Sequence, residues 1–393
     1  MDRAGEISLL ETLLQYVDTK TTAMAAAPWR NEVTAYTCPE RHKREEQTLI
    51  RKRPLVMGLS CDWPKPGAYR TDDFAGVPIL TVRGSDGTLR AFLNACRHRG
   101  AKVAHGCGSA GAFTCPYHAW TFDSGGQLVS LPAEDGYGPS FDRSQFGLAP
   151  VPRVDSYRGF VFASWCPDGP TLLEHLGRSA EMIDRLCDLS PVGQIEVRAG
   201  WLRHRISANW KLAAENVCDF YHPPVTHASS GLAAGLAATY FSDVSGAVAR
   251  DLGGGHGEID HRPMHARSTP RPAESYHGLR RRHLELLAER DGQLSAAARL
   301  QVGPPHGFVF PNLFIAELSV FVIEPVAVGE MTHRQTPIAW AGLPDELNRR
   351  HLRSFEGGFG PAGMVEPDDA AVWERLQLGL RASEPEWVVL QRG

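Results

Sequence analysis

The sequence predicts an α+β protein in which a small antiparallel β domain precedes a larger domain of mixed strands and helices. Short β-branched runs separated by turn residues recur between residues 55 and 165. A helical pattern over residues 172–189 follows, and mixed strand and helix patterns continue from there. The length of 393 residues suits two or three domains.

The N-terminal segment carries apolar side chains at helical spacing, among them Ile7, Leu10 and Val17, so an amphipathic helix is expected over residues 6–24. The stretch from there to residue 50 is charged and irregular and is interpreted as a connector. We therefore expect residues 1–49 to form a helix and connector that pack on the larger domain.

The small domain is expected over residues 50–166 and the larger one over residues 167–393. Strand-like runs lie at 77–82 and 160–165, and turn residues such as Ser-Asp-Gly at 85–87 separate them. A small β domain of this kind can carry ligand-binding residues on its loops.

Two short segments of the small domain each pair one cysteine with one histidine, namely Cys96 with His98 and Cys115 with His118. Two thiolates on one iron and two neutral imidazoles on the other fit a mixed-ligand iron-sulfur centre. Zinc is the alternative, but its sites usually pair cysteine with cysteine and histidine with histidine. Without a metal, the four would be ordinary core residues. The pattern favours a carrier of single electrons.

A second group of metal-binding residue types lies in the larger domain. Residues 209–222 favour a helix that puts Asp219 and His222 on one face, and two prolines then end the helix before His227. Two imidazoles can converge there, and two histidines with one carboxylate form the Fe(II) site of non-heme oxygenases. Taken alone, the pair is better explained as core or capping histidines.

The carboxylate ligand must come from elsewhere, and a Glu-Pro-Asp-Asp segment that opens an amphipathic helix is the best candidate. Asp369 shares a stripe with Trp373, Leu376 and Leu380, so it is expected to point inward, whereas Asp368 lies on a more exposed face. Without the histidine pair, both aspartates are explained as helix caps that answer the helix dipole.

The flanks of both cysteine–histidine segments, with Gly67, Asn94 and the turn at 123–128, closely resemble the Rieske [2Fe-2S] domain. In the same chain order, residues 209–227 and the late Asp-Asp pair complete a resemblance to the large (alpha) subunit of Rieske non-heme iron aromatic-ring-hydroxylating oxygenases. The resemblance runs from about residue 50 to residue 380.

This resemblance implies a helix-grip (START-like) fold for the larger domain, with an antiparallel sheet around a long helix. It assigns a Rieske [2Fe-2S] cluster to the four cysteine and histidine ligands, and a mononuclear Fe(II) to His222, His227 and Asp369. Asp219 would be the catalytic residue that links the cluster of one subunit to the mononuclear iron of its neighbour. A head-to-tail homotrimer follows, with or without an added beta subunit.

The implied activity is that of a terminal oxygenase in aromatic hydrocarbon catabolism, a dioxygenase that hydroxylates an apolar aromatic substrate, usually to a cis-dihydrodiol. Two electrons would come from a separate ferredoxin or reductase, because the chain shows no dinucleotide or flavin fingerprint, so no bound NAD or flavin is expected. An apolar pocket would orient the ring. Ordinary core packing explains each candidate wall residue equally well: Val217, Phe220, Phe310 and Phe359.

Two further features, a histidine-containing segment and one cysteine, are given structural interpretations. Residues 253–272 are rich in glycine, proline and histidine and are interpreted as a surface loop or lid, with His256, His261 and His265 solvated rather than metal-bound. Cys107, between the two ligand segments, is interpreted as a small buried packing residue.

The amino-acid composition limits the classes of binding partner that are expected. A net charge of -4 and a pI near 6.5 give no electrostatic reason to bind nucleic acid or an anionic membrane. The eight cysteines form no dense disulfide framework, which suits a reduced cytoplasmic compartment. The sequence shows no signal peptide and no apolar run of about 18 residues. We expect a cytoplasmic protein whose partners are small molecules and proteins.

Two alternatives remain open. A Rieske monooxygenase, or an O- or N-demethylase acting on an aromatic or related small molecule, would use the same iron chemistry. An electron-transfer Rieske protein without oxygenase activity would leave His222, His227 and Asp369 without a function.

Overall fold

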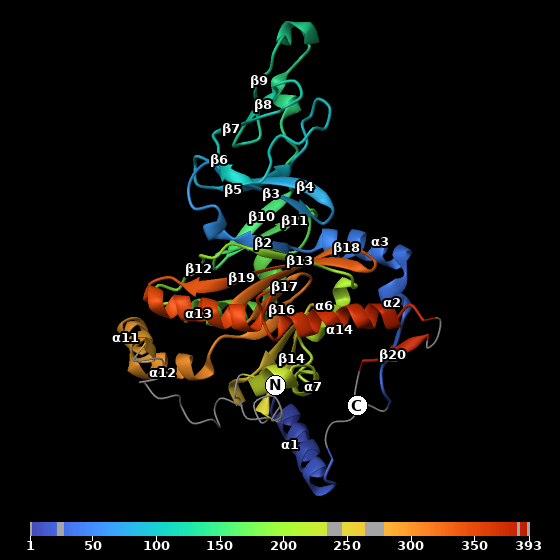
Figure 1. Cartoon of the computed structure of the whole chain (residues 1–393), viewed down its shortest axis with the longest axis vertical. Coiled ribbons are helices and arrows are strands. Elements are labelled where there is room, and N and C mark those ends of the chain that lie inside the picture. The colour runs from blue at the N-terminus through green and yellow to red at the C-terminus, as the bar shows by residue number, and fades with distance from the viewer. Residues whose placement is uncertain (1, 22–26, 234–245, 264–278, 383–385, 391–393) are drawn as a thin grey trace.

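The computed structural model describes residues 2–21, 27–233, 246–263, 279–382 and 386–390. Figure 1 shows a narrow β module at one end of the molecule and a broader layer of sheet and helices beneath it. The expected α+β class, with a small antiparallel β domain and a second domain of antiparallel sheet and helices, is confirmed.

Three small antiparallel sheets make up the β module, with strand orders β5-β4-β3-β6, β7-β8-β9 and β10-β11-β2. Its core is continuous with that of the larger domain, because β2 and β11 share buried clusters with the large sheet. The strands are β2 (Leu55–Leu59), β3 (Ala68–Phe74), β4 (Val77–Arg83), β5 (Leu89–Leu93), β6 (Cys107–Ser109), β7 (Ala112–Thr114), β8 (Thr121–Asp123), β9 (Leu128–Ser130), β10 (Arg153–Tyr157) and β11 (Phe160–Ser164).

The described part of the larger domain contains an eight-stranded antiparallel sheet in the order β12-β19-β18-β17-β16-β15-β14, with β13 also paired to β19. β17 and the first half of β18 are buried throughout, which explains their continuous apolar sequence. The strands are β12 (Ile195–Val197), β13 (Leu202–Ile206), β14 (Val248–Gly253), β15 (His256–Asp260), β16 (His306–Val309), β17 (Leu313–Ala316), β18 (Ser319–Ala327) and β19 (Glu330–Trp340).

Helices cover this sheet, and Figure 1 shows α13 and α14 following one another along the same side. α13 packs on β19, α6 packs on β18, and α14 packs on α6. This arrangement agrees with the expected helix-grip fold. The helices are α4 (Leu172–Leu176), α5 (Ala180–Cys187), α6 (Trp210–Asn216), α7 (Pro223–Thr226), α8 (Ala228–Ala233), α11 (Leu279–Asp291), α12 (Gln293–Val302), α13 (Asp345–Gly358) and α14 (Glu366–Gly379).

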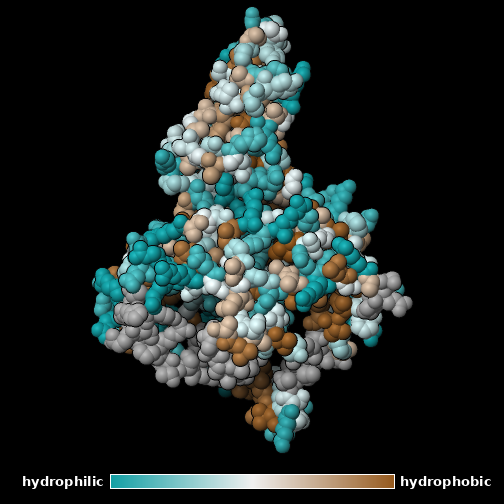
Figure 2. All heavy atoms as spheres, viewed as in Figure 1, coloured by the Kyte–Doolittle hydropathy of each residue, from teal (hydrophilic) through white to brown (hydrophobic). Residues whose placement is uncertain are grey.

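The N-terminal helix forms as α1 (Arg3–Asp18), but none of its residues is buried. Its apolar face lies open, with Val17 73% exposed, and Figure 2 shows brown, apolar atoms on this projecting element. The expected packing of this helix on the larger domain is therefore not observed, because periodicity predicts an apolar face but not what covers it. Among the described residues, no helix is both long and apolar enough to cross a membrane.

The connector is more ordered than predicted, since α2 (Thr34–Thr37) and α3 (Pro39–Thr48) replace the expected irregular chain. Pro39 occupies the first position of α3, where its missing N–H costs nothing. The connector does pack on the larger domain: the Tyr36 hydroxyl bonds the Glu215 carboxylate at 2.9 Å, and Lys211 Nζ lies 2.6 Å from Glu45 Oε2. Before it, β1 (Arg30–Glu32) pairs with β20 (Trp387–Val389).

The expected surface loop at 253–272 is wrong in its first part, where β14 and β15 form a hairpin turned by Gly253, Gly254 and Gly255 at positive φ. His256 is buried at 4% exposure, with its Nε2 2.7 Å from the His175 carbonyl oxygen, so it is not solvated. The glycines therefore mark a tight turn rather than a lid. His265 lies outside the described residues.

A buried arginine joins the two domains. Arg334, on β19, is 4% exposed and donates to the Met57 carbonyl oxygen of β2 at 2.6 Å. Its guanidinium also lies 3.2 Å from Glu324 Oε1 and 4.8 Å from the centre of the Trp201 ring. Because a buried charge must be paired, this cation ties the sheet of the larger domain to the β module.

We predict that Arg334→Ala lowers the free energy of unfolding by about 3 kcal/mol, because it leaves the Glu324 carboxylate without its buried cationic partner, while the Met57 carbonyl oxygen keeps its bond from Arg70. Arg205→Ala, on the adjacent strand, removes an exposed arginine paired to Glu330 and should cost less than about 1 kcal/mol. Denaturant unfolding of both variants measures the difference. Equal losses would contradict a special function for Arg334.

Candidate metal centres

The two cysteine–histidine loops of the β module share one backbone design. In each loop the cysteine N–H donates to the carbonyl oxygen five residues on, as Cys96 does to Ala101 and Cys115 does to Trp120. The fourth residue after each cysteine, Gly100 or Ala119, adopts positive φ and donates back to the cysteine carbonyl oxygen. The loops therefore present the two cysteines in the same way, while the histidine lies two residues after Cys96 and three residues after Cys115.

The four side chains lie together at this point. Cys96 and Cys115 are each 3% exposed, and burial together with the neighbouring Cys115 sulfur raises the pKa of the Cys96 thiol. The His98 and His118 ring centres are 4.5 Å apart, and Nδ1 of each is buried without a hydrogen-bond partner among the described residues. Buried ring nitrogens without donors or acceptors fit metal ligands better than core histidines. The side chains therefore fit a cluster held by two sulfurs and two nitrogens.

The surroundings of His118 favour its neutral imidazole. Burial lowers the pKa of His118, and the nearby His98 and Arg99 lower it further. Trp120 stacks on the His98 ring at 5.1 Å between centres, and the Asn94 side chain fixes the loop by accepting the Val103 N–H at 2.9 Å. These contacts hold the His98 ring and its loop in place beside His118, as ligands of a metal require.

Cys107 does not pack in the core as expected. It is exposed on β6, which lies at the edge of its sheet. Sequence alone could not tell which face of this short edge strand the side chain occupies.

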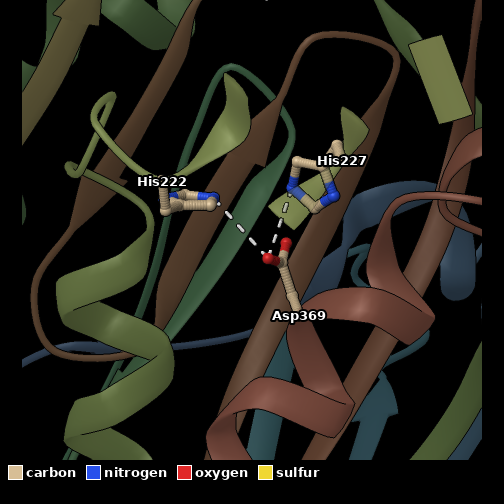
Figure 3. Close-up of side chains that lie close together, drawn as sticks. All are labelled: His222, His227 and Asp369. Atoms are coloured by element: carbon tan, nitrogen blue, oxygen red, sulfur yellow. Dashed lines mark ion pairs between the residues drawn. The ribbon is translucent and has the colours of Figure 1, made fainter. Parts of the chain in front are cut away.

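The larger domain brings His222, His227 and Asp369 together. Asp369 Oδ1 lies 3.5 Å from His222 Nε2 and 3.3 Å from His227 Nε2. Figure 3 shows the two rings on either side of the carboxylate, with α14 contributing the aspartate. One ligand atom from each residue lies within 4.8 Å of the others, so a single ion can contact all three.

The backbone conformation that brings the two histidines to Asp369 differs from the predicted one. α6 ends at Asn216 rather than His222, and Pro223 begins the short helix α7 instead of merely stopping a helix. Asp219 and His222 therefore do not share a helix face. The turn between α6 and α7 brings them together instead, with Asp219 Oδ2 3.4 Å from His222 Nδ1.

α14 presents its carboxylate much as its sequence suggested. Asp369 is 7% exposed, and Asp368 is less buried, with its Oδ2 3.7 Å from His227 Nδ1. The buried face then continues through Trp373 and Gln377, whereas Leu376, expected on the inward stripe, is 46% exposed. The stripe predicted from apolar residues missed Gln377 because its amide is buried through hydrogen bonds with Asn209 and Tyr36.

A buried oxygen of Asp369 that lacks a hydrogen-bond donor in the described part of the chain indicates that the three residues can hold a metal ion. Asp369 Oδ1 is buried and has no hydrogen-bond partner among the described residues, although two ring nitrogens face it. A buried carboxylate oxygen without a donor is costly. A divalent ion between the three atoms would satisfy it, and two histidines with one carboxylate match the open Fe(II) sites of oxygenases.

Asp219 is an ionised, half-buried carboxylate beside this site. Burial acts to raise its pKa, but hydrogen bonds from the His222 ring and from the Tyr221 N–H at 2.6 Å produce a net lowering of the pKa. It can therefore accept the Nδ1–H of His222 and fix the tautomer whose Nε2 faces the ion.

The four predicted pocket residues lie in two places. Val217, Phe310 and Phe359 belong to the extended apolar core, while the Phe220 ring lies 5.1 Å from that of His261. Sequence reasoning missed His306, which lies in the same region. Burial, with His261 and His222 nearby, lowers the pKa of His306 to about 3. The available signal was a histidine at the start of the apolar strand β16 (His306–Val309).

Two family models match the chain. The Rieske [2Fe-2S] domain matches residues 54–155, and the ring hydroxylating alpha subunit (catalytic domain) matches residues 190–389. Together they cover both metal-binding groups described above.

Individual relatives agree with these matches. The chlorobenzene dioxygenase subunit alpha of Cupriavidus sp. (strain PS12) is 31% identical over 363 residues, covering 90% of this chain and 80% of that protein. The N,N-dimethyl phenylurea N-demethylase subunit alpha of Sphingobium sp. (strain YBL2) is 30% identical, covering 84% and 76%. The solved structure of naphthalene 1,2-dioxygenase from Rhodococcus sp. bound to indole has a TM-score of 0.79 and 27% identity, covering 94% of this chain and 85% of that chain.

We predict that metal affinity at the histidine–aspartate site falls as the pH drops, starting above the ordinary histidine pKa of about 6.5. Burial alone would lower the pKa of His227, but the Asp369 and Asp368 carboxylates raise it overall. A proton then competes with the metal below that raised pKa, at about tenfold in affinity per pH unit. Fe(II) titrations under anaerobic conditions measure the profile.

Asp368→Asn is the matched variant, because it removes one of the charges that raise the pKa of His227 and keeps all three ligands. Its decline in affinity should begin at lower pH than in the wild type. Affinity that stays constant through this range in the wild type would contradict the prediction.

Proposed function

This chain belongs to the family of ring-hydroxylating oxygenase alpha subunits, and we propose that it uses O2 and two externally supplied electrons to cis-dihydroxylate an apolar aromatic substrate. The single observation that best supports this is the meeting of His222, His227 and Asp369 in a chain that also carries the Rieske-type loops. An electron carrier alone would have no use for the second group, so this observation speaks against a non-catalytic Rieske protein.

The cofactors of this family are a Rieske [2Fe-2S] cluster and a mononuclear iron. We assign the cluster to Cys96, His98, Cys115 and His118, and the iron to His222, His227 and Asp369. When bound, the mononuclear iron supplies the binding and reduction of O2.

The residues of the chain would then hold the metal ligands in place and orient the substrate. The imidazoles of His98 and His118 would hold one iron of the cluster, and the lowered pKa of His118 favours its neutral form. The ionised Asp219 would hold His222 in the tautomer that presents Nε2 to the iron. Val217, Phe310 and Phe359 supply an apolar wall for the substrate ring, with Phe220 at its margin. Orientation beside the iron, rather than acid–base chemistry, is what these apolar residues can contribute.

A neighbouring copy would complete the electron path. In Figure 1, β7 and β8, which flank His118, lie near one end of the molecule, while α7 and α14 lie in the opposite half. This separation supports transfer between subunits in a head-to-tail homotrimer, with Asp219, 44% exposed at its side chain, as the contact to the partner's cluster. A small beta subunit would add to this trimer without entering the path.

The electrons would come from a separate ferredoxin or reductase, since multicomponent relatives such as the naphthalene 1,2-dioxygenase system of Ralstonia sp. name a large oxygenase component. A cytoplasmic location, where such reduced donors occur, is part of the same proposal and agrees with the free cysteines of the described chain.

A monooxygenase or demethylase is the second candidate. The observation in its favour is that an N-demethylase subunit is as similar to this chain, at 30% identity, as several dioxygenase subunits are. The two reactions differ in the number of oxygen atoms that enter the product.

We predict that Asp219→Asn keeps the cluster and the mononuclear iron but reduces turnover about a hundredfold or more, since the neutral amide lacks the negative charge that would couple the His222 ring to the partner's cluster. Iron content, cluster absorbance and product formation are measured on the same preparations. Asp251→Asn, an exposed aspartate on β14, is the control and should retain full turnover. Near-normal activity of Asp219→Asn would remove this residue from the path.

The proposed reaction is tested with isotopic O2, an aromatic hydrocarbon such as naphthalene, and a ferredoxin–reductase pair. We expect two labelled oxygen atoms in a cis-dihydrodiol, and no NADH oxidation by this chain alone. One labelled atom, or loss of a methyl group from a methylated substrate, would replace dihydroxylation by the second candidate. No oxygen incorporation with any substrate class, despite a reducible cluster, would contradict an oxygenase.

A further inference from the structure

A buried histidine–carboxylate pair lies one helical turn before Asp369 and has no part in the function described so far. Glu366, the first residue of α14, is 4% exposed, and His333 in β19 is fully buried. His333 Nδ1 lies 2.5 Å from Glu366 Oε1. The pair therefore joins the start of the helix that carries Asp369 to a strand in the interior of the large sheet.

His333 is held on all sides. Its ring stacks on Phe321 at 5.0 Å and 25°, and meets the edge of Trp373 at 5.7 Å and 71°. Its backbone lies between two paired strands, with His204 of β13 on one side and Ile323 of β18 on the other. The imidazole is thus a fixed donor, and the Glu366 carboxylate must come to it.

A gain in folding stability does not explain why such a buried pair is present. Burial of a carboxylate costs free energy that one ion pair barely offsets, and apolar replacements of buried pairs are often at least as stable. A directional bond between fixed groups does, however, specify one position of a helix. α14 needs this, because its N-cap residue Val365 makes no side-chain hydrogen bond.

The position of α14 determines whether the metal ligands meet. Glu366, Asp369 and Trp373 lie along one buried face of the helix, so a shift of its first turn moves the Asp369 carboxylate with it. Asp369 Oδ1 is 3.3 and 3.5 Å from the two histidine nitrogens, and a metal site tolerates displacements of only about 0.5 Å.

We propose that Glu366 and His333 are a positioning pair that fixes the first turn of α14 and thereby places the Asp369 carboxylate between His222 and His227. This inference rests on the proposed function, because it takes Asp369 as a metal ligand. Neither member of the pair is a ligand itself.

The chain offers a matched control on the same helix. Glu374, two turns after Glu366, accepts the backbone N–H of Ser207 at 3.0 Å and so also ties α14 to a neighbouring segment. It lies beyond Asp369, away from the first turn. Its loss should therefore affect the stability of the protein but not the placement of the ligand.

The test uses the full chain with its cluster intact and its mononuclear site emptied by a chelator, then titrated anaerobically with Co(II) as a spectroscopic probe. Glu366→Ala should weaken Co(II) binding about tenfold or more. Glu366→Gln should recover most of the affinity, because the amide oxygen still accepts the His333 N–H. Glu374→Ala should bind Co(II) as the wild type does, even where its melting temperature falls as far as that of Glu366→Ala.

His333→Phe tests the other member of the pair, since it keeps the aromatic stack and removes the hydrogen-bond donor. It should weaken Co(II) binding as much as Glu366→Ala does. Wild-type affinity in both variants, or an equal loss in Glu374→Ala, would overturn the positioning function while leaving the metal site intact. Failure of the wild type itself to bind Co(II) would overturn the metal assignment and this inference with it.

Discussion

The convergence of one carboxylate on two imidazoles is the constraint on which the molecule depends. His222 and His227 sit at the two ends of the short helix α7, while Asp369 comes from α14, close to the C-terminal end of the described chain. The large sheet separates these segments in sequence and brings them together in space, because α6 packs on β18 and α14 packs on α6. A fold that holds this contact can bind a metal that no short segment could bind.

The two metal-binding groups solve the same electrostatic problem differently. A histidine must be neutral to bind a metal. In the β module, burial and then the neighbouring His98 and Arg99 lower the pKa of His118, which favours the neutral ring without a metal. Beside α14, carboxylates raise the pKa of His227, so the ion must displace a proton there. Protonation therefore competes with the metal at His227 at a higher pH than it does at His118.

Sequence was informative wherever the chemistry was local. The two cysteine–histidine loops, and the inward direction of Asp369, follow from spacing alone, and a resemblance in motif order suggested the rest. Tertiary contacts decided what spacing could not: α6 stops at Asn216, and Leu376 is exposed while Gln377 is buried. Likewise the glycines at 253–255 turn a hairpin rather than a lid. Glu366 was visible only as part of an acidic helix start, because its partner His333 lies on a distant strand.

The most direct measurement of the central claim is anomalous diffraction at the iron edge from crystals of the anaerobically prepared protein. The account predicts one strong peak, from two irons, between the two cysteine–histidine loops, and a second, weaker peak among His222, His227 and Asp369. A map with the cluster peak alone, in which these three side chains contact one another but hold no metal, would contradict it.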